Sequence, residues 1–396
     1  MKTLYLHVGT TKTATSSIQR FLEENRTVLE KYGYCFPDSL HVYPEANRRR
    51  NAHFLIGKVK DENGVEDKQK EEEYLEEGLQ QIRTAFQTYD NVILTDESIW
   101  YALSYSKKSL LRELKKEADK QQYQIKVIVY LRRQDALLIS RWNQEVKQNF
   151  TSAAVMTCEE YVAVSEKKEN KIFYYAKKLD EIADVIGKDH LIVRRFSPES
   201  WKDRSIIHDF MHEIGLDVTD EFEELKESEN LRLDQNTTEI KRILNKNEDF
   251  TEKEVSYMGR LLKGVSKGYI KTEKTEMLAK EELQQFLGEY AEENNRVAEE
   301  YIGDGQPLFS NEIKDLPKWN PQNGTMQEEM IQFFAAVAMD LKRENDLQRQ
   351  RMEQQEKRIR DLEKRTKYLE KRANEFLMFR EKAKHPFRTI WRKIFR

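Results

Sequence analysis

The stretch that most constrains the fold is the first twenty residues, where a short apolar run leads directly into a turn rich in hydroxyl groups. Residues 4–8 form a β-rich apolar run of the kind that makes a buried strand. Gly9 interrupts this run, and residues 16–22 then place apolar side chains at helical spacing. The sequence therefore predicts a buried strand, a turn and a helix, in that order.

The turn between the strand and the helix is rich in groups that bind anions. Its residues are Thr10, Thr11, Lys12, Thr13, Ala14, Thr15 and Ser16. In a strand-to-helix turn, successive backbone N–H groups point to a common centre, and the helix N-terminus adds partial positive charge. Because five hydroxyls around one lysine exceed what helix capping needs, we predict a phosphate or sulfate site. An ordinary capped turn is the alternative.

The turn does not carry the usual nucleotide-binding pattern G-x-x-x-x-G-K-[ST]. Lys12 precedes the small residue Ala14 instead of following a glycine. This turn alone therefore does not tell whether the chain binds a nucleoside triphosphate or a sulfuryl donor, and a second motif is needed.

That second motif occupies residues 130–144, where a strand pattern ends in paired arginines and a helix pattern follows. Arg132 at the strand end and Ser140, eight residues later, would place a cation and a hydroxyl beside one anion. Arg133 is a second candidate, since a guanidinium fork suits phosphate oxygens. An arginine that only caps the sheet edge is the alternative.

The two motifs together resemble those of sulfotransferases that use 3′-phosphoadenosine-5′-phosphosulfate (PAPS). The order Lys-[Ser/Thr]-[Gly/Ala]-Thr-[Ser/Thr] is similar to their 5′-phosphosulfate loop, and the pair Arg132 and Ser140 is similar to their 3′-phosphate site. Residues 193–198, 207–216 and 294–301 look like later blocks of the bacterial enzymes that act on cell-surface glycans. The resemblance spans about residues 1–309. It implies PAPS as cofactor, release of 3′-phosphoadenosine 5′-phosphate (PAP), no metal, and a capsule or exopolysaccharide acceptor.

Strand patterns alternate with helix patterns along this part of the chain. Residues 32–37, 92–95 and 125–131 read as further strands, and the acidic residues 60–81 as a surface helix. The alternation predicts an α/β fold with a P-loop-like parallel sheet flanked by helices and with ligands at the carboxyl ends of the strands. Residues 219–300 predict either a helical cap over an acceptor cleft or a solvated helical layer.

Sulfuryl transfer needs a cation for the leaving oxygen and a base for the hydroxyl proton of the acceptor. Lys12 is suited to the first role. The resemblance implies a His or Glu for the second, and Glu97, at the end of a strand, has the matching kind of position; a carboxylate that only stabilises a helix N-terminus is the alternative. His53 is the second candidate for the base and Asp96 the third.

Two other functions compete with a sulfotransferase. A kinase or another nucleoside-triphosphate enzyme is one, because residues 92–96 could be a strand that ends in a Mg²⁺-binding aspartate. A non-enzymatic scaffold tethered to a membrane is the other.

Composition limits the surroundings in which the chain works. Charged residues make up 35% of the chain and the net charge is −3, so we expect a highly solvated protein. Its two cysteines, Cys35 and Cys158, have no metal-binding spacing and form no disulfide framework, which fits a reducing cytoplasm.

Beyond a predicted linker at residues 310–325, a heptad pattern begins and predicts a coiled coil over residues 326–376. One core position recurs as Ala338, Asn345, Met352, Ile359, Thr366 and Ala373, and the other as Leu341, Gln348, Gln355, Leu362, Leu369 and Phe376. Arginines at g and glutamates at e would pair across a parallel homodimer. A lone amphipathic helix on the main domain is the alternative.

The last twenty residues, 377–396, hold seven Lys or Arg and one Glu. After Pro386, aromatic and aliphatic residues recur at helical spacing with cations largely off that stripe. Such a helix lies in an anionic lipid interface, which predicts a cytoplasmic protein bound peripherally to the inner face of the membrane. Docking on the protein's own domain or on a partner protein is the alternative.

Overall fold

The computed structural model describes residues 1–44, 46–105, 109–149, 151–167, 172–225, 233–268 and 274–384. It divides into two compact units, Met1–Met326 and Gln327–Arg396. All candidate site residues lie in the first unit.

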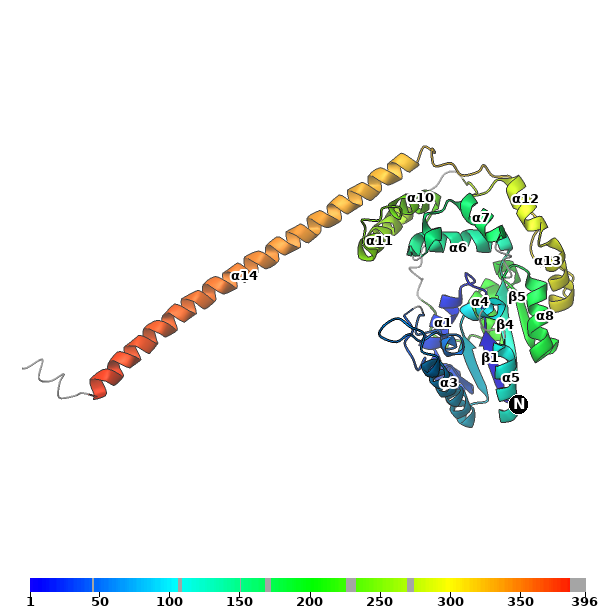
Figure 1. Cartoon of the computed structure of the whole chain (residues 1–396), viewed down its shortest axis with the longest axis horizontal. Helices are drawn as coiled ribbons and strands as arrows, with labels where there is room; N and C mark the ends of the chain where they lie inside the picture. The colour runs from blue at the N-terminus through cyan, green and yellow to red at the C-terminus, as the bar shows by residue number, and fades with distance from the viewer. Residues whose placement is uncertain are drawn as a thin grey trace, which may run out of the picture. The chain divides into compact units, whose positions relative to one another are not determined.

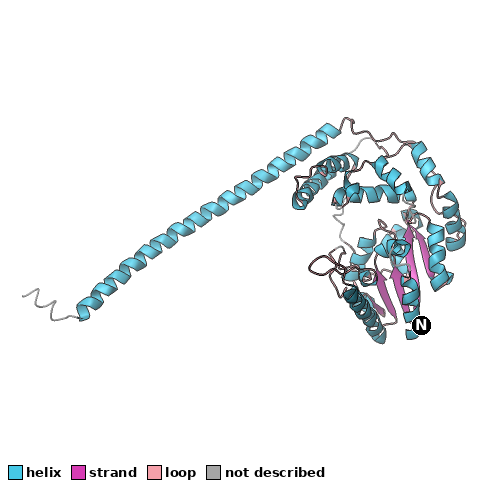
Figure 2. Cartoon of the chain, viewed as in Figure 1, coloured by secondary structure: helices cyan, strands magenta, loops and turns pink. Residues whose placement is uncertain are grey.

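The first unit is built on a five-stranded parallel sheet with the strand order β2-β3-β1-β4-β5 (Figure 2). Its strands are β1 (Thr3–His7), β2 (Tyr34–Cys35), β3 (Asn91–Thr95), β4 (Gln124–Leu131) and β5 (Leu191–Arg195). The predicted parallel α/β sheet is confirmed. Because β1 and β4 are neighbours, the two segments that carry the predicted anion motifs leave the same edge of the sheet side by side.

The first unit also contains helices, several of which pack on the two faces of this sheet (Figure 1). They are α1 (Thr15–Glu24), α2 (Arg26–Lys31), α3 (Lys68–Thr88), α4 (Ser98–Tyr105), α5 (Leu110–Gln121), α6 (Gln134–Gln148), α7 (Cys158–Lys167), α8 (Tyr175–Ile186), α9 (Ile206–Glu213), α10 (Gln235–Leu244), α11 (Glu252–Gly268), α12 (Lys280–Gly288) and α13 (Ala291–Val297).

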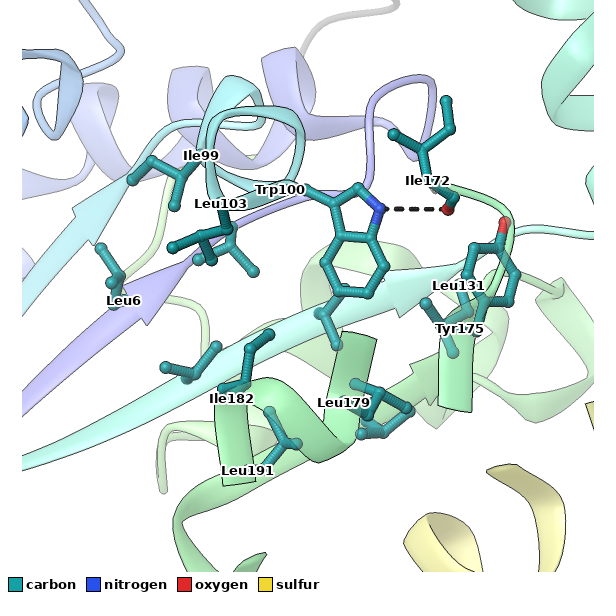
Figure 3. Close-up of a cluster of buried hydrophobic side chains, with 14 of the residues drawn as sticks. Leu6, Ile99, Trp100, Leu103, Leu131, Ile172, Tyr175, Leu179, Ile182 and Leu191 are labelled. Carbon is teal, nitrogen blue, oxygen red and sulfur yellow. Dashed lines mark hydrogen bonds between the residues drawn. The ribbon is translucent and has the colours of Figure 1, made fainter. Parts of the chain in front are cut away.

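Each face of the sheet has its own hydrophobic core, because side chains alternate along a strand. In β1, Leu4 and Leu6 join the larger core with α3, α4, α5, α6 and α8, whereas Tyr5 joins the smaller core with α1 and α9. Figure 3 shows the centre of the larger core, where the Trp100 indole N–H donates to the carbonyl of Ile172 at 3.3 Å. This contact packs the start of α4, directly after Glu97, against a rigid core.

The predicted cap region contains α10, α11, α12 and α13, and its first helix packs against α6 (Figure 1). The Thr238 hydroxyl donates to Asn143 Oδ1 at 2.8 Å, and Asn245 Nδ2 donates to the carbonyl of Val146 at 2.8 Å. These bonds fix α10 along the helix that carries Ser140. Whether the region covers an acceptor stays a prediction.

The segment expected to be a linker, residues 310–325, belongs to the first unit and packs against other parts of it. Lys318 forms ion pairs with Glu159 at 3.1 Å and Glu282 at 3.0 Å, and the Trp319 indole N–H donates to Asn236 Oδ1 at 2.8 Å. The prolines and the glycine interrupt regular structure, as the sequence predicted, but these side chains hold the segment in place.

The second unit contains the helix α14 (Met326–Lys384), 59 residues long. Members of the predicted heptad seam are exposed on this single helix, among them Met352, Ile359, Leu362, Leu369 and Phe376. The helix is therefore confirmed, and its pairing with a second copy stays a prediction. Residues 385–396 of the predicted membrane-binding tail lie outside the described residues. Across the part of the chain that the structure describes, no helix combines the length and the apolar character needed to cross a membrane.

Candidate functional site

The predicted anion turn begins at Gly9, where the chain must pass very close to Glu97. Gly9 has a φ of +108°, and a Cβ at this position would lie 3.2 Å from the Cα, Cβ and carbonyl oxygen of Glu97. The Tyr130 N–H donates to the carbonyl of Gly9 at 2.7 Å, and the Thr10 N–H donates back to the carbonyl of Tyr130 at 3.0 Å. The turn is thus fixed between the ends of β3 and β4, and a side chain at residue 9 would force it away from Glu97.

Two of the predicted site hydroxyls hold the turn together. The Thr13 hydroxyl is buried and donates to the carbonyl of Thr10 at 2.5 Å, and the Thr10 hydroxyl donates to the carbonyl of Tyr130 at 3.2 Å. Lys12 and Ala14 have φ values of +65° and +57°, so the chain changes direction twice before α1. Such left-handed positions let successive N–H groups point inward, as an anion site requires.

The end of the turn leads into α1 without a side-chain cap. Ala14 occupies the N-cap position and its side chain has no polar atom to offer. Thr15 is buried in the first turn of the helix, and Ser16 is exposed. The partial positive charge of the helix N-terminus therefore faces the turn without a capping side chain.

Arg132 brings the two motifs into contact. Its Nη1 donates to the backbone carbonyl of Lys12 at 2.8 Å, and its guanidinium lies 5.5 Å from the centre of the Phe196 ring. The Tyr175 hydroxyl donates to the carbonyl of Arg132 at 2.6 Å. One backbone carbonyl and two side chains, from three other segments, thus set the position of this arginine at the edge of the anion turn.

Helix α6 supplies the remaining wall of the turn. Ser140 is half-buried on this helix, and Gln144 lies one helical turn farther along the same face. The Lys12 ammonium donates to the Gln144 amide oxygen. Lys12 therefore reaches from the turn to the helix that carries Ser140, and Gln144 joins the candidate site.

Arg133 has a different environment from Arg132. Its Nε and Nη2 donate to the two carboxylate oxygens of Asp135 at 2.9 and 2.8 Å, and its Nη1 donates to the carbonyls of Ser310 and Glu312 at 3.2 and 3.1 Å. The hydrogen bond to Asp135 raises the pKa of Arg133 above its ordinary value. These bonds fix Arg133 as a link between α6 and residues 310–312, and Arg132 is the arginine that faces the anion turn.

Two of the three base candidates form one buried cluster. Asp96 is fully buried; its Oδ1 accepts from Arg50 Nη2 at 2.6 Å and from the Ser98 N–H at 2.8 Å. Its Oδ2 lies 2.6 Å from His53 Nδ1, and His53 is itself buried. Because both carboxylate oxygens are occupied, Asp96 is poorly suited to bind Mg²⁺ or to meet an acceptor hydroxyl.

Glu97 is the base candidate with an accessible carboxylate. Its side chain is 19% exposed, against 0% for Asp96. Glu97 Oε2 accepts from the Gln19 amide at 2.9 Å and lies 3.8 Å from Arg50 Nε. The amide and the guanidinium orient this carboxylate beside Gly9, at the start of the anion turn.

Arg132 also lines a cavity of about 670 Å³. Its wall includes the apolar side chains of Ile139, Trp142, Met277 and Ile313, and the polar side chains of Asn143 and Gln235. Charged residues, among them Asp234 and Glu276, line the cavity as well, so its wall is about as polar as it is apolar. Among the described residues, no three His, Cys, Asp or Glu side chains gather closely enough to hold a metal ion.

Comparisons with known proteins do not identify a function for this site. No family model matches the chain. An uncharacterized protein of Archaeoglobus fulgidus is 28% identical over 182 residues, which are 45% of this chain and 46% of that protein, so the matched part spans about half the length of the curated relative.

A sulfotransferase from Alicyclobacillus acidocaldarius is a solved structure similar to this chain, with a TM-score of 0.34 and 15% identity over 61% of this chain and 92% of that one. A TM-score this low does not establish that the two chains share a fold. The case for a function therefore depends on the residues of the chain itself.

Several contact residues of the site are not among those that the sequence predicted. Gln19 and Arg50 orient Glu97, and Gln144 binds Lys12. Helical spacing gives a signal for Gln144, since it follows Ser140 by four residues within the second motif. The partners of Glu97 come from distant segments and leave no local signal.

Proposed function

We propose that this chain is a sulfotransferase that moves a sulfuryl group from PAPS to a hydroxyl of a cell-surface glycan and releases PAP. The observation that carries the proposal is the hydrogen bond from Arg132 to the carbonyl of Lys12. It brings together two anion-binding motifs that lie 120 residues apart in the sequence. PAPS has two anionic ends, a 5′-phosphosulfate and a 3′-phosphate, which suit these two motifs.

In this proposal each motif holds one end of the donor. Backbone N–H groups of residues 11–16 and the N-terminus of α1 would bind the 5′-phosphosulfate, and Arg132 with Ser140 would bind the 3′-phosphate. The Thr10 N–H is already bonded to the carbonyl of Tyr130. The cavity of about 670 Å³ beside Arg132 has room for the nucleoside.

The reaction needs little covalent work from the protein. Glu97 would take the proton of the acceptor hydroxyl while its oxygen forms the new bond to sulfur. Lys12 would neutralise the bridging oxygen as its bond to sulfur breaks and the electron pair leaves with the phosphate. The accessible carboxylate of Glu97 supports this choice of base over the buried His53 and Asp96.

Calorimetry with PAP in the presence of a metal chelator tests the donor site. We expect PAP to bind the full chain and the Arg132→Ala/Ser140→Ala variant to bind it about 100-fold more weakly, since a hydrogen bond to a charged group contributes about 1.5–3 kcal/mol. Arg112→Ala, at an exposed position on α5, is the matched control. Lys12→Ala should remove turnover.

Two results contradict this proposal. If ATP with Mg²⁺ stabilises the chain and PAP does not, a nucleoside-triphosphate enzyme is favoured. If the double variant keeps the wild-type affinity for PAP, the two motifs do not form the donor site.

The second unit extends the proposal to partners and location. A parallel homodimer through α14 would cover the exposed apolar residues of its heptad seam. The basic residues of 377–396 would hold the enzyme at an anionic cytoplasmic membrane surface, where a growing glycan is accessible.

A further inference from the structure

Gln19 is a buried amide on the helix that follows the anion turn. It belongs to α1 and is 1% exposed, whereas the buried residues next to it on this helix, Ile18, Phe21 and Leu22, are apolar and join the smaller core. A buried amide costs free energy unless its hydrogen bonds are made, and an apolar side chain of the same size would avoid that cost. The contacts of the amide therefore have to explain its presence.

The amide group of Gln19 bonds to the base candidate. Its Nε2 donates to Glu97 Oε2 at 2.9 Å, and the same nitrogen lies 3.5 Å from the hydroxyl of Thr95. An amide nitrogen carries two hydrogens, so it can serve both acceptors. Thr95 is fully buried, and its hydroxyl lies 3.0 Å from His7 Nδ1. Because Thr95 and His7 are paired residues at the ends of β3 and β1, the amide is held against two neighbouring strands.

The two oxygens of the Glu97 carboxylate have different surroundings. Oε2 accepts from Gln19 and lies 3.8 Å from Arg50 Nε. No donor among the described residues forms a hydrogen bond with Oε1. The side chain is 19% exposed, so a ligand can reach the carboxylate. Oε1 is therefore the oxygen that is left to accept a proton from an acceptor hydroxyl.

Gln19 also fixes the base relative to the proposed donor site. It lies four residues beyond Thr15, the first residue of α1, which corresponds to about 6 Å along the helix axis. In the proposed function the N-terminus of this helix binds the 5′-phosphosulfate. One rigid helix would thus hold the donor at its first turn and the base at its second. In-line transfer depends on such a fixed distance between the base and the sulfur.

We propose that Gln19 is a positioning residue for the sulfuryl transfer, which binds Oε2 of Glu97 and so presents Oε1 to the acceptor hydroxyl. The hydroxyl proton goes to Oε1 while the hydroxyl oxygen forms the new bond to sulfur. The bond from sulfur to the bridging oxygen breaks, and its electron pair leaves with the phosphate. This inference rests on the proposed function. It assigns a role to a residue outside the anion turn and identifies the oxygen that takes the proton.

A double-mutant cycle on turnover separates positioning from a purely structural role. Turnover is the release of PAP from PAPS by the full chain, with maltotriose, chitotriose or trigalacturonate as the acceptor, and with water where no glycan product forms. Gln19→Met keeps the size of the side chain and removes the amide, so turnover should fall about 10–100-fold with the PAP affinity unchanged. In the Glu97→Gln background, which has no base to position, Gln19→Met should cause no further loss.

Two other variants check this interpretation. Gln19→Asn keeps a buried amide but is shorter by one methylene, which withdraws the donor from Oε2, so it should reproduce the loss of turnover. Gln87→Met makes the same replacement as Gln19→Met at an exposed position of α3 and should leave turnover unchanged. Urea unfolding shows whether each variant is folded. If Gln19→Met does not fold, the cycle is run with Gln19→Asn.

Each contrary outcome has a distinct meaning. Unchanged turnover in Gln19→Met overturns the positioning role. An equal loss in the Glu97 and Glu97→Gln backgrounds assigns Gln19 to the structure of α1 and also overturns it. In both cases the turnover of the wild type still supports a sulfotransferase. If the wild type releases no PAP from PAPS, the proposed function fails, and the role of Gln19 fails with it.

Discussion

The buried histidine His7 makes the stability of the folded chain depend on pH. It ends β1, two residues before Gly9; it is fully buried, and its Nδ1 lies 3.0 Å from the hydroxyl of Thr95. Its Nε2 has no hydrogen-bond partner within the described residues. Burial lowers the pKa of His7 from 6.5 to about 3, although the charge of Asp96 acts in the opposite direction. The fold therefore holds the neutral imidazole.

The sign of the effect follows from proton binding in the two states. Between pH 6.5 and about 3 the unfolded chain binds a proton at His7 that the folded chain does not, so stability falls as the pH falls through this range. At about pH 5 the loss relative to about pH 7.5 is about 2 kcal/mol, because each pKa unit corresponds to about 1.4 kcal/mol.

Urea unfolding of the full chain and of His7→Asn at these two pH values measures this contribution. Asparagine can keep a polar atom near Thr95 and cannot take up a proton, so the wild type should lose about 2 kcal/mol more than the variant on acidification. His212→Asn, at an exposed position, is the control and should follow the wild type. Equal losses in the wild type and His7→Asn would refute the reasoning.

Three further predictions concern catalysis, assembly and location. Glu97→Gln keeps the shape of the side chain and cannot accept a proton, so turnover should fall roughly 10²–10⁴-fold with PAP affinity unchanged; near-normal turnover would transfer the role to His53. Light scattering should show a dimer that becomes a monomer when the chain is truncated at Thr325, and a monomeric full-length chain would contradict the predicted coiled coil. Sedimentation with liposomes should require anionic lipid, decrease with salt and disappear when residues 377–396 are deleted; equal sedimentation of the deleted protein would exclude the tail as anchor.

Local patterns in the sequence were sufficient to predict the sheet and the position of its ligand edge. Residues 4–8, 92–95 and 125–131 are compact β-rich runs separated by helical patterns, and all three correspond to neighbouring parallel strands. The helix expected at residues 60–81 begins later, at Lys68, because the Asp67 carboxylate caps its first turn by accepting from the Lys70 N–H. Element types depend mainly on neighbours in sequence, which is why they were predictable. The start of this helix has a local signal too, the capping Asp67, but the acidic composition of residues 60–81 as a whole does not reveal it.

The conformation of the anion turn was only partly predictable. The sequence showed that hydroxyls and one lysine gather after β1, but the tertiary structure uses Thr10 and Thr13 to hold the turn together. A hydroxyl that donates to a backbone carbonyl of the turn has the same local sequence as one that faces a ligand. The contact of Gly9 with Glu97 likewise depends on the pairing of β1 with β3.

The sequence alone determined that two cationic motifs follow two strands, and that three residues could serve as the base. Only the tertiary structure distinguished Arg132, which bonds to the turn, from Arg133, which bonds to Asp135 and residues 310–312. It also separated Glu97, whose carboxylate is accessible, from the buried Asp96. The physical reason is the same in each case: residue type and spacing specify which chemical groups are present, whereas burial and partners from distant segments decide which of them remain available to a ligand.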